Sequence, residues 1–221
     1  MTKAEELYKI WKNYKSNEWK KRLRKVGCVS EEDVNGFLKL VGEREEWWYS
    51  WILGYFVSFV LNKCYQDRFI ELDVDAVEGK INVGRHLDWD GVIYVRGDVR
   101  TNVGYGMKRG KIVVEGDVGG YVGESMEGGV IIVDGNVDGN VGWGMKDGVV
   151  VVKGNIRTEV GLAMKGGYIL VSGNVGDYVG RSMKGGFIYI GGKVENERLN
   201  KYLGKGVVDC NGIWYFSRWV E

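Results

Sequence analysis

The chain has 221 residues, which is enough for one large domain or two small ones. Its 31 Lys and Arg residues balance 30 Asp and Glu residues, so no overall charge excess would draw it to nucleic acid or to an anionic membrane. The 3 cysteines, Cys28, Cys64 and Cys210, are too sparse for a disulfide framework and too far apart for a Cys-x-x-Cys metal pair, which favours a cytoplasmic location.

Residues 1–66 predict an α-helical, aromatic-rich N-terminal domain. Apolar residues recur at helical spacing from Lys3 to Val26 with a polar stretch at Lys15–Glu18, so we expect one helix, unbroken or broken there. Ser30 precedes three acidic residues and is predicted to cap a second helix, because its hydroxyl can accept a backbone N–H. The basic stretch Lys20–Lys25 is interpreted as a solvated helix face rather than a nucleic-acid patch, since no RNA-binding fingerprint accompanies it.

The stretch from Trp47 to Leu61 is apolar nearly all round, which predicts a helix that is covered on most sides. It is shorter than the roughly 20 residues needed to span a bilayer, so we expect a buried helix and no membrane span. A weaker alternative is a peripheral helix that inserts its Trp and Tyr side chains into the headgroup zone of a membrane.

Residues 67–221 contain a 19-residue repeat. A Gly-Asp or Gly-Asn pair opens each unit, and columns of Val-Gly, of Met and of a further glycine keep the same step. The first column is Gly97, Gly116, Gly135, Gly154 and Gly173. A unit this short cannot hold a helix pair and suits one coil of short strands that pairs with the coils above and below. The sequence therefore predicts a mainly β fold, a parallel β-helix of 19-residue coils with a C-terminal cap.

The alternation of side chains along each strand predicts which columns face the core. The inward positions are Ile112, Val114, Val118, Val122 and Met126, with their 19-residue equivalents. The methionines are interpreted as core packing, because a flexible thioether fills irregular corners. The ladder Asp98, Asp117, Asn136, Asn155, Asn174 is interpreted as turn chemistry, in which short polar side chains tolerate left-handed backbone and bond neighbouring amides. A cation held between Asp98 and Asp117 is the alternative.

The outward positions of the strands are unusually apolar, and we call them together the outer strand surface. They are Val92, Lys111, Val130, Val149, Tyr168, Phe187, Tyr94, Val113, Ile132, Val151, Leu170 and Tyr189. Stacked over six coils, they would form a larger apolar patch than soluble monomers usually expose, so something must cover it. We predict that the helix from Trp47 to Leu61 lies along this surface, with its other side on the N-terminal helices or on a second chain. The interface candidates are Trp47, Trp48, Trp51, Tyr55, Phe59, Val113, Ile132, Val151, Leu170 and Tyr189.

The sole histidine, His86, lies in an atypical first coil, where Gly84 to Gly91 is one residue longer than the equivalent segment of the next coil. Asp88 and Asp90 lie close by in the sequence, so an enzyme that uses these three residues is the alternative to a non-catalytic protein. No P-loop or dinucleotide fingerprint is present, since each Gly-x-Gly leads into a strand rather than a helix. We therefore assign no catalytic, cofactor-binding or metal-binding residue and expect no cofactor.

The repeated pattern G-x-V-x-x-x-V-G-x-x-M-x-x-G, as in Gly97 to Gly110, extends over roughly Asp73 to Val194 and resembles the GXGXG domain family. That family includes the C-terminal β-helix of the large chain of glutamate synthase and one component of formylmethanofuran dehydrogenase. The resemblance implies a right-handed parallel β-helix that acts as a structural element of a multi-subunit oxidoreductase, with the redox chemistry carried elsewhere. We therefore expect a non-catalytic scaffold or partner-binding protein that forms a homo-oligomer or joins a multi-protein complex.

Overall fold

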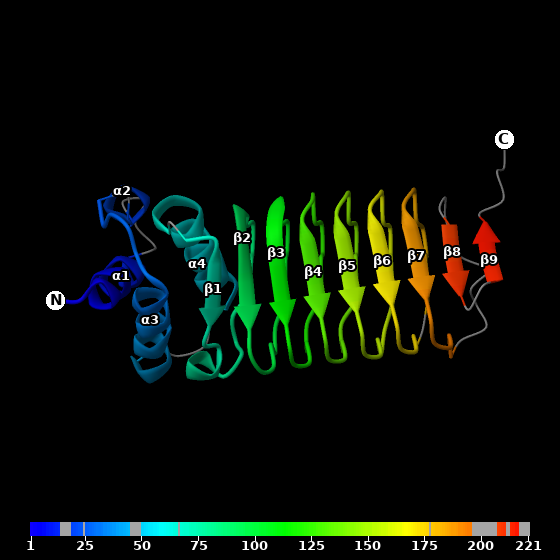
Figure 1. Cartoon of the computed structure of the whole chain (residues 1–221), viewed down its shortest axis with the longest axis horizontal. Helices are drawn as coiled ribbons and strands as arrows, with labels where there is room; N and C mark the ends of the chain where they lie inside the picture. The colour runs from blue at the N-terminus through cyan, green and yellow to red at the C-terminus, as the bar shows by residue number, and fades with distance from the viewer. Residues whose placement is uncertain are drawn as a thin grey trace.

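The computed structural model describes residues 1–13, 19–23, 25–44, 50–65, 67–176, 178–195, 207–210 and 213–216. The described chain is elongated, with the helices gathered at one end and a stack of β coils extending away from them (Figure 1). The prediction of a mainly β, parallel β-helix fold with N-terminal helices is confirmed.

Each coil contributes one short strand to a single sheet whose strands follow one another in chain order. Strands β1 to β8 run parallel: β1 (Phe69–Leu72), β2 (Asp88–Val95), β3 (Arg109–Val114), β4 (Val130–Val133), β5 (Val149–Val152), β6 (Tyr168–Val171), β7 (Phe187–Ile190) and β8 (Val207–Cys210). Strand β9 (Ile213–Phe216) pairs antiparallel with β8. The register keeps the predicted step, because Ile112 pairs with Ile131 and Ile131 pairs with Val150.

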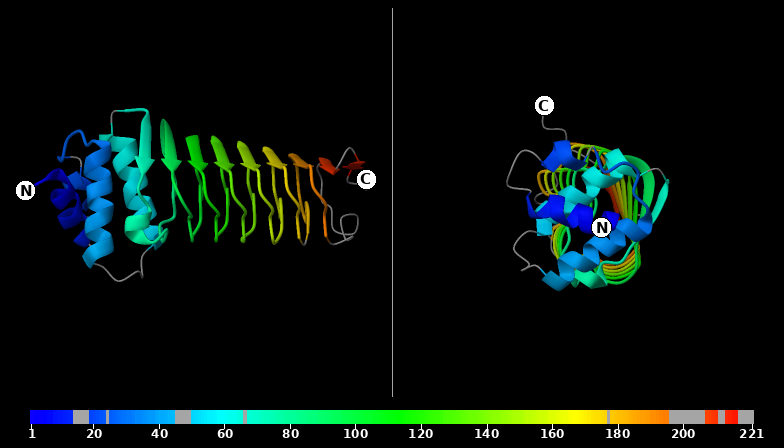
Figure 2. Two further views of the ribbon diagram at one scale, coloured as in Figure 1. Left: turned by 60° about the horizontal axis from the view of Figure 1, so that its bottom comes forward. Right: turned by 90° about the vertical axis from the view of Figure 1, so that its left-hand side faces the viewer.

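Two further valine columns bridge the coils on their other sides. In one, Val99 pairs with Val118 and so on down the stack, and in the other Val103 pairs with Val122. The coils therefore superpose in the end-on view of Figure 2. The inward positions predicted from the sequence are all buried, with Ile112, Val114, Val118, Val122 and Met126 at most 1% exposed.

The methionine column lies in the core, which confirms its interpretation as packing. Met107, Met126, Met145, Met164 and Met183 are each at most 1% exposed. A glycine column makes room for these side chains. At Gly129, where φ is +87°, a Cβ atom would come within 2.8 Å of the Met107 Cε and of the Gly110 carbonyl oxygen. Only a residue without a side chain fits that approach.

The polar ladder at the turns does bond backbone amides, as predicted, but it does so from one coil to the next. Asp98 Oδ1 accepts from the backbone N of Asp117 at 2.8 Å, and Asp117 Oδ1 accepts from the backbone N of Asn136 at 2.6 Å. The prediction of left-handed backbone at these residues is wrong, because none of them has a positive φ, and of the glycines that precede them only Gly97 does, with φ +80°. The two aspartates thus act as hydrogen-bond acceptors in the stack.

The N-terminal helices are α1 (Lys3–Lys12), α2 (Trp19–Leu23), α3 (Glu31–Arg44) and α4 (Ser50–Cys64), and a short 3₁₀ helix follows at Asp75–Val77. The predicted cap at Ser30 is confirmed, since its Oγ accepts from the backbone N of Asp33 at 3.2 Å. Helix α1 begins with a capping box between Thr2 and Glu5, which was not predicted. None of the described helices is both long enough and apolar enough to cross a membrane.

Helix α4 lies across the open end of the β-helix, so the prediction that it covers the outer strand surface is wrong (Figure 2). Gly54 of α4 packs so closely on the first coil that a Cβ there would come within 1.9 Å of the Asn82 carbonyl oxygen. On the opposite side, Phe56 packs against Trp11 at 5.7 Å and Phe37 at 5.2 Å between ring centroids. The helix is apolar all round because it separates the end of the coil stack from the other helices.

Helix α3 covers the free edge of β1 with side chains. The side-chain amide of Asn35 donates to the Glu71 carbonyl at 2.8 Å and accepts from the backbone N of Asp73 at 3.0 Å. Glu31, one turn earlier, accepts from the backbone N of Glu71 at 2.8 Å. These bonds occupy the backbone groups that an additional strand would otherwise use.

Candidate functional site

The first candidate site is the outer strand surface, which is most exposed at the C-terminal coils. Tyr168 is 56% exposed, Leu170 37% and Tyr189 38%, and the ring of Tyr168 lies 6.3 Å from that of Phe187. The remaining members on β2 to β5 are half-buried, among them Val113, Ile132 and Val151. Within the described part of the chain, this surface carries exposed aromatic and aliphatic side chains rather than a covering helix.

The five helix residues predicted to join this surface are placed elsewhere or are not described. Trp47, Trp48 and the side chain of Trp51 lie outside the described residues. Tyr55 and Phe59 are half-buried at the end of the β-helix, where both rings pack against Trp19, at 6.3 Å and 5.2 Å. They therefore belong to a second site.

This second site, which we call the cap hollow, is an open depression of about 540 Å³ where α4 meets the first coils. Helix α4 contributes Tyr55, Phe59 and Asn62, the first coil contributes Arg85, His86 and Asp88, and the second coil contributes Lys108. The sequence prediction of a small-molecule site near His86 thus corresponds to a real depression, but Asp90 is not in its lining.

The backbone conformation of His86 and two aromatic neighbours hold its ring in the lining of the hollow. Its φ of 53° is left-handed, and its ring packs edge-on against Tyr55 at 5.9 Å and Tyr105 at 5.2 Å. The equivalent position one coil on is Gly106, where a Cβ would come within 2.6 Å of the imidazole Nδ1. Partial burial, together with the charge of Arg85, lowers the pKa of His86, which favours the neutral ring.

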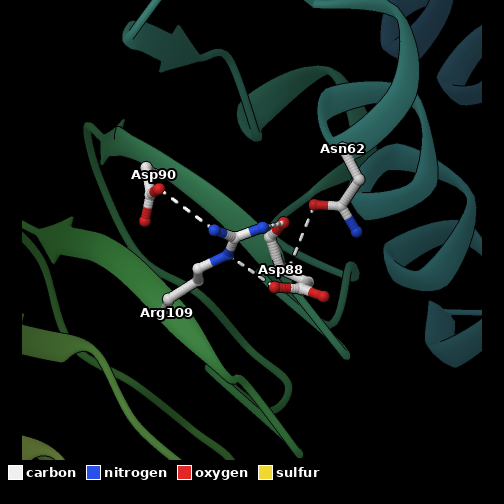
Figure 3. Close-up of polar contacts among 4 residues, drawn as sticks. All are labelled: Asn62, Asp88, Asp90 and Arg109. Carbon is white, nitrogen blue, oxygen red and sulfur yellow. Dashed lines mark hydrogen bonds and ion pairs between the residues drawn. The ribbon is translucent and has the colours of Figure 1, made fainter.

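Asp88 and Asp90 both bind the side chain of Arg109 (Figure 3). The Arg109 Nε donates to Asp88 Oδ1 at 2.6 Å and the Arg109 Nη1 donates to Asp90 Oδ2 at 3.1 Å. The backbone N of Asp88 donates to the Asn62 Oδ1 at 3.0 Å, which fixes the first coil to α4. Of the three residues in the enzyme alternative, His86 and Asp88 line the hollow and Asp90 does not.

The remaining polar groups of the hollow are mainly donors. Because Asn62 accepts through Oδ1, its Nδ2 faces away from that bond, and it donates to no residue of the described chain. The Lys108 ammonium likewise forms no hydrogen bond or ion pair within the described residues. Arg85 places its guanidinium 4.1 Å from the Tyr105 ring centre. Burial raises the pKa of Glu124 on the third coil, and the charge of Arg85 partly opposes this rise.

The sequence contained a signal for only one of the residues that the prediction missed. Arg109 stands in a column that otherwise holds small or acidic residues, namely Gly128, Asp147, Gly166 and Gly185. A long, positively charged side chain in this column indicates that the surface of the second coil differs from that of the later coils. Asn62 and Lys108 carried no such signal, because an exposed lysine recurs in that column and α4 has no repeat.

Comparisons of the chain with protein-family models, curated proteins and solved structures find no match. Function is therefore inferred from the geometry of the outer strand surface and the cap hollow.

Proposed function

We propose that this protein is a non-catalytic, partner-binding β-helix that assembles through its outer strand surface. The observation that carries the proposal is the exposure of Tyr168, Leu170 and Tyr189 on neighbouring strands. Aromatic and aliphatic side chains clustered on a rigid sheet have the composition of an interface core, in which Tyr is enriched. A sheet face of this kind, when left in water, would be a liability for solubility.

The partner we propose is a second copy of the chain, packed sheet against sheet. The next outward position along each strand forms a margin of Arg96, Glu115, Asp134, Lys153, Ser172 and Gly191. A twofold axis parallel to the strands and midway between β4 and β5 would set Asp134 of one copy against Lys153 of the other. Arg96 and Glu115 would then face the neutral Gly191 and Ser172, so no like charges would oppose each other.

The size of the surface predicts a weak, reversible dimer. Six coils at about 4.8 Å and four residues at about 3.4 Å give a face of roughly 400 Å² per copy. Stable complexes bury about 800 Å² per partner, and smaller ones are usually transient. The resemblance to GXGXG domains, carried by the glycine, valine and methionine columns, supports the further proposal that such an assembly serves a multi-subunit oxidoreductase.

The enzyme alternative receives less support from the cap hollow. General acid–base chemistry needs titratable groups within hydrogen-bond reach of a common substrate atom. Here Asp88 is bound to Arg109, and Asp90 lies outside the hollow. Among the described residues, no hydrogen bond joins the His86 ring to a carboxylate, although Glu127 lies within electrostatic reach of it.

The test compares two leucine-to-lysine changes in the same coil. Leu170 lies on the outer strand surface, whereas Leu162 lies on another side, in a column that already holds Arg85, Glu124 and Arg181. Sedimentation velocity should show reversible dimers of the native chain and of Leu162→Lys as concentration rises, while Leu170→Lys stays monomeric. A native chain that remains monomeric at all concentrations, or a Leu170→Lys variant that dimerises normally, would refute the proposal.

A further inference from the structure

The cap hollow combines an aromatic wall on α4 with several hydrogen-bond donors. Tyr55 and Phe59 form the wall on α4, and each is half-buried by its packing on Trp19. Its volume of about 540 Å³ is within the range of sites that hold small molecules. A ligand with a flat apolar part would therefore find a preformed surface on α4.

The charge in the hollow is positive. Lys108 and Arg85 face it, and Lys20 lies just behind, with its ammonium 3.5 Å from the Tyr55 hydroxyl. Of the three nearby carboxylates, Asp88 is paired with Arg109, which also binds Asp90, and Glu127 is paired with Lys146. Burial favours the protonated form of the third, Glu124. The Asn62 Nδ2 adds a neutral donor on the α4 side. An anion bound here would meet several donors and no free carboxylate in the described part of the lining.

We propose that the cap hollow binds a small organic anion, with its phosphate or carboxylate group at Lys108 and Asn62 and its apolar part against Tyr55 and Phe59. This inference is independent of the proposed dimer, because the hollow lies at the end of the β-helix and the outer strand surface lies along its side. The hollow includes both the cap helix and the coils, so a bound anion would also stabilise the junction between them.

The sole histidine of the chain reports directly on this site. The charges that act on its ring come from Arg85 of its own coil, Lys108 of the second and Glu127 of the third. The ring also packs on Tyr105 and on Tyr55 of α4, Asp88 lines the same hollow, and Glu124 lies within electrostatic reach of Arg85. A bound anion favours the imidazolium form, so it should raise the pKa of His86 from its lowered value. By linkage, the anion should bind more tightly as the pH falls between the two pKa values.

The experiment follows the His86 ring proton by NMR while phenyl phosphate or benzoate is added to the full chain, with benzyl alcohol as the neutral analogue. We expect a saturable shift and a raised His86 pKa with at least one of the two anions, and neither effect with the alcohol. Comparison of phenyl phosphate with benzoate shows which anionic group the site prefers. Failure of both anions to give a saturable shift would overturn the proposal.

Two variants localise the effect. Asn62→Asp keeps the acceptor for the Asp88 amide but replaces the Nδ2 donor with a negative charge, and Lys108→Met removes the ammonium. Each should weaken anion binding by about tenfold or more, since a charge-assisted hydrogen bond is lost. Lys184→Met is the matched control, because Lys184 occupies the same column at the far end of the coils. Binding that survives both hollow variants, or that Lys184→Met abolishes, would place the anion elsewhere.

Discussion

Gly142 and Gly144 lie two residues apart in the same turn, and both have left-handed backbone, with φ of +70° and +62°. Their surroundings differ. A Cβ on Gly142 would come within 2.3 Å of Ile169 Cδ1 in the core, whereas a Cβ on Gly144 would meet its nearest atom at 3.8 Å. Other coils place Ser125 and Ala163 at the position of Gly144, again with positive φ. Backbone conformation alone thus does not explain why the Val-Gly column is invariant in the repeat.

We predict that Gly144→Ala lowers the free energy of unfolding by only about 1 kcal/mol, the cost of a left-handed alanine. Gly142→Ala should add a further 1–3 kcal/mol or so, because the new methyl group displaces Ile169 within a close-packed core. Urea unfolding of the two variants measures the difference. Equal losses at the two positions would show that the tight approach to Ile169 is relieved without strain.

The sequence could predict individual residues wherever the repeat was regular. Val118 and Met126 were placed in the core because their columns recur, and each proved at most 1% exposed. The contact of Arg109 with Asp90 spans the regular 19-residue step, so the aligned column identifies this neighbour although the contact was not predicted. The contact of Arg109 with Asp88 arises where the register between β2 and β3 shifts, and there an aligned column does not identify the neighbour.

At the scale of one coil, the hydrogen bonds repeat so regularly that coils should be interchangeable. Each coil bonds to the next through equivalent atoms, as when Asp117 Oδ1 accepts from Asn136 and Asn136 Oδ1 accepts from Asn155. Removal of residues 129–147 would bring Asn155 beside Asp117 and Val149 beside Lys111, in the same register. Solenoid stability is nearly a sum of coil terms and nearest-neighbour terms.

We therefore predict that deletion of Gly129–Asp147 leaves a folded protein that unfolds cooperatively at a lower urea concentration. Deletion of residues 129–138, about half of a coil, is the control and should abolish folding, because it removes β4 and leaves too few residues to close a coil, which breaks the ladder. Circular dichroism during urea titration distinguishes the two. If the full-coil deletion unfolds the chain as completely as the half-coil deletion, coils are not independent units.

The position of α4 shows what an apolar pattern leaves undetermined. A helix that is apolar all round must be covered, but the pattern does not say by which surface. Two apolar surfaces were available to it, the outer strand surface and the open end of the coil stack, where Leu87 and Val83 are buried. The structure places α4 at the end, where it meets Asn82 and His86 on one side and the α1–α3 helices on the other.

At the scale of the whole molecule, the long sheet has two ends, and an uncovered strand edge would pair with another chain. At the N-terminal end, α3 prevents this with two side chains one helical turn apart. Asn35 forms hydrogen bonds with Glu71 and Asp73, and Glu31 forms one with Glu71. A single helical turn thus imitates the hydrogen bonding of a further strand, and because it uses side chains it cannot itself be extended by another molecule.

We predict that Asn35→Ala weakens this cap and allows end-to-end association of the rods. Loss of both Asn35 bonds leaves the Glu71 carbonyl and the Asp73 amide without partners, which should lower the free energy of unfolding by about 1–3 kcal/mol.

Glu32→Ala is the matched control, because Glu32 is exposed on the same helix and forms no hydrogen bond with the described residues. Both substitutions should be made in a Leu170→Lys background, so that association through the outer strand surface does not contribute. Urea unfolding measures the loss of stability, and light scattering measures growth in mass with concentration. If the Asn35 variant matches the Glu32 variant in both measurements, then the packing of α3 on β1, rather than its hydrogen bonds, keeps the edge from pairing.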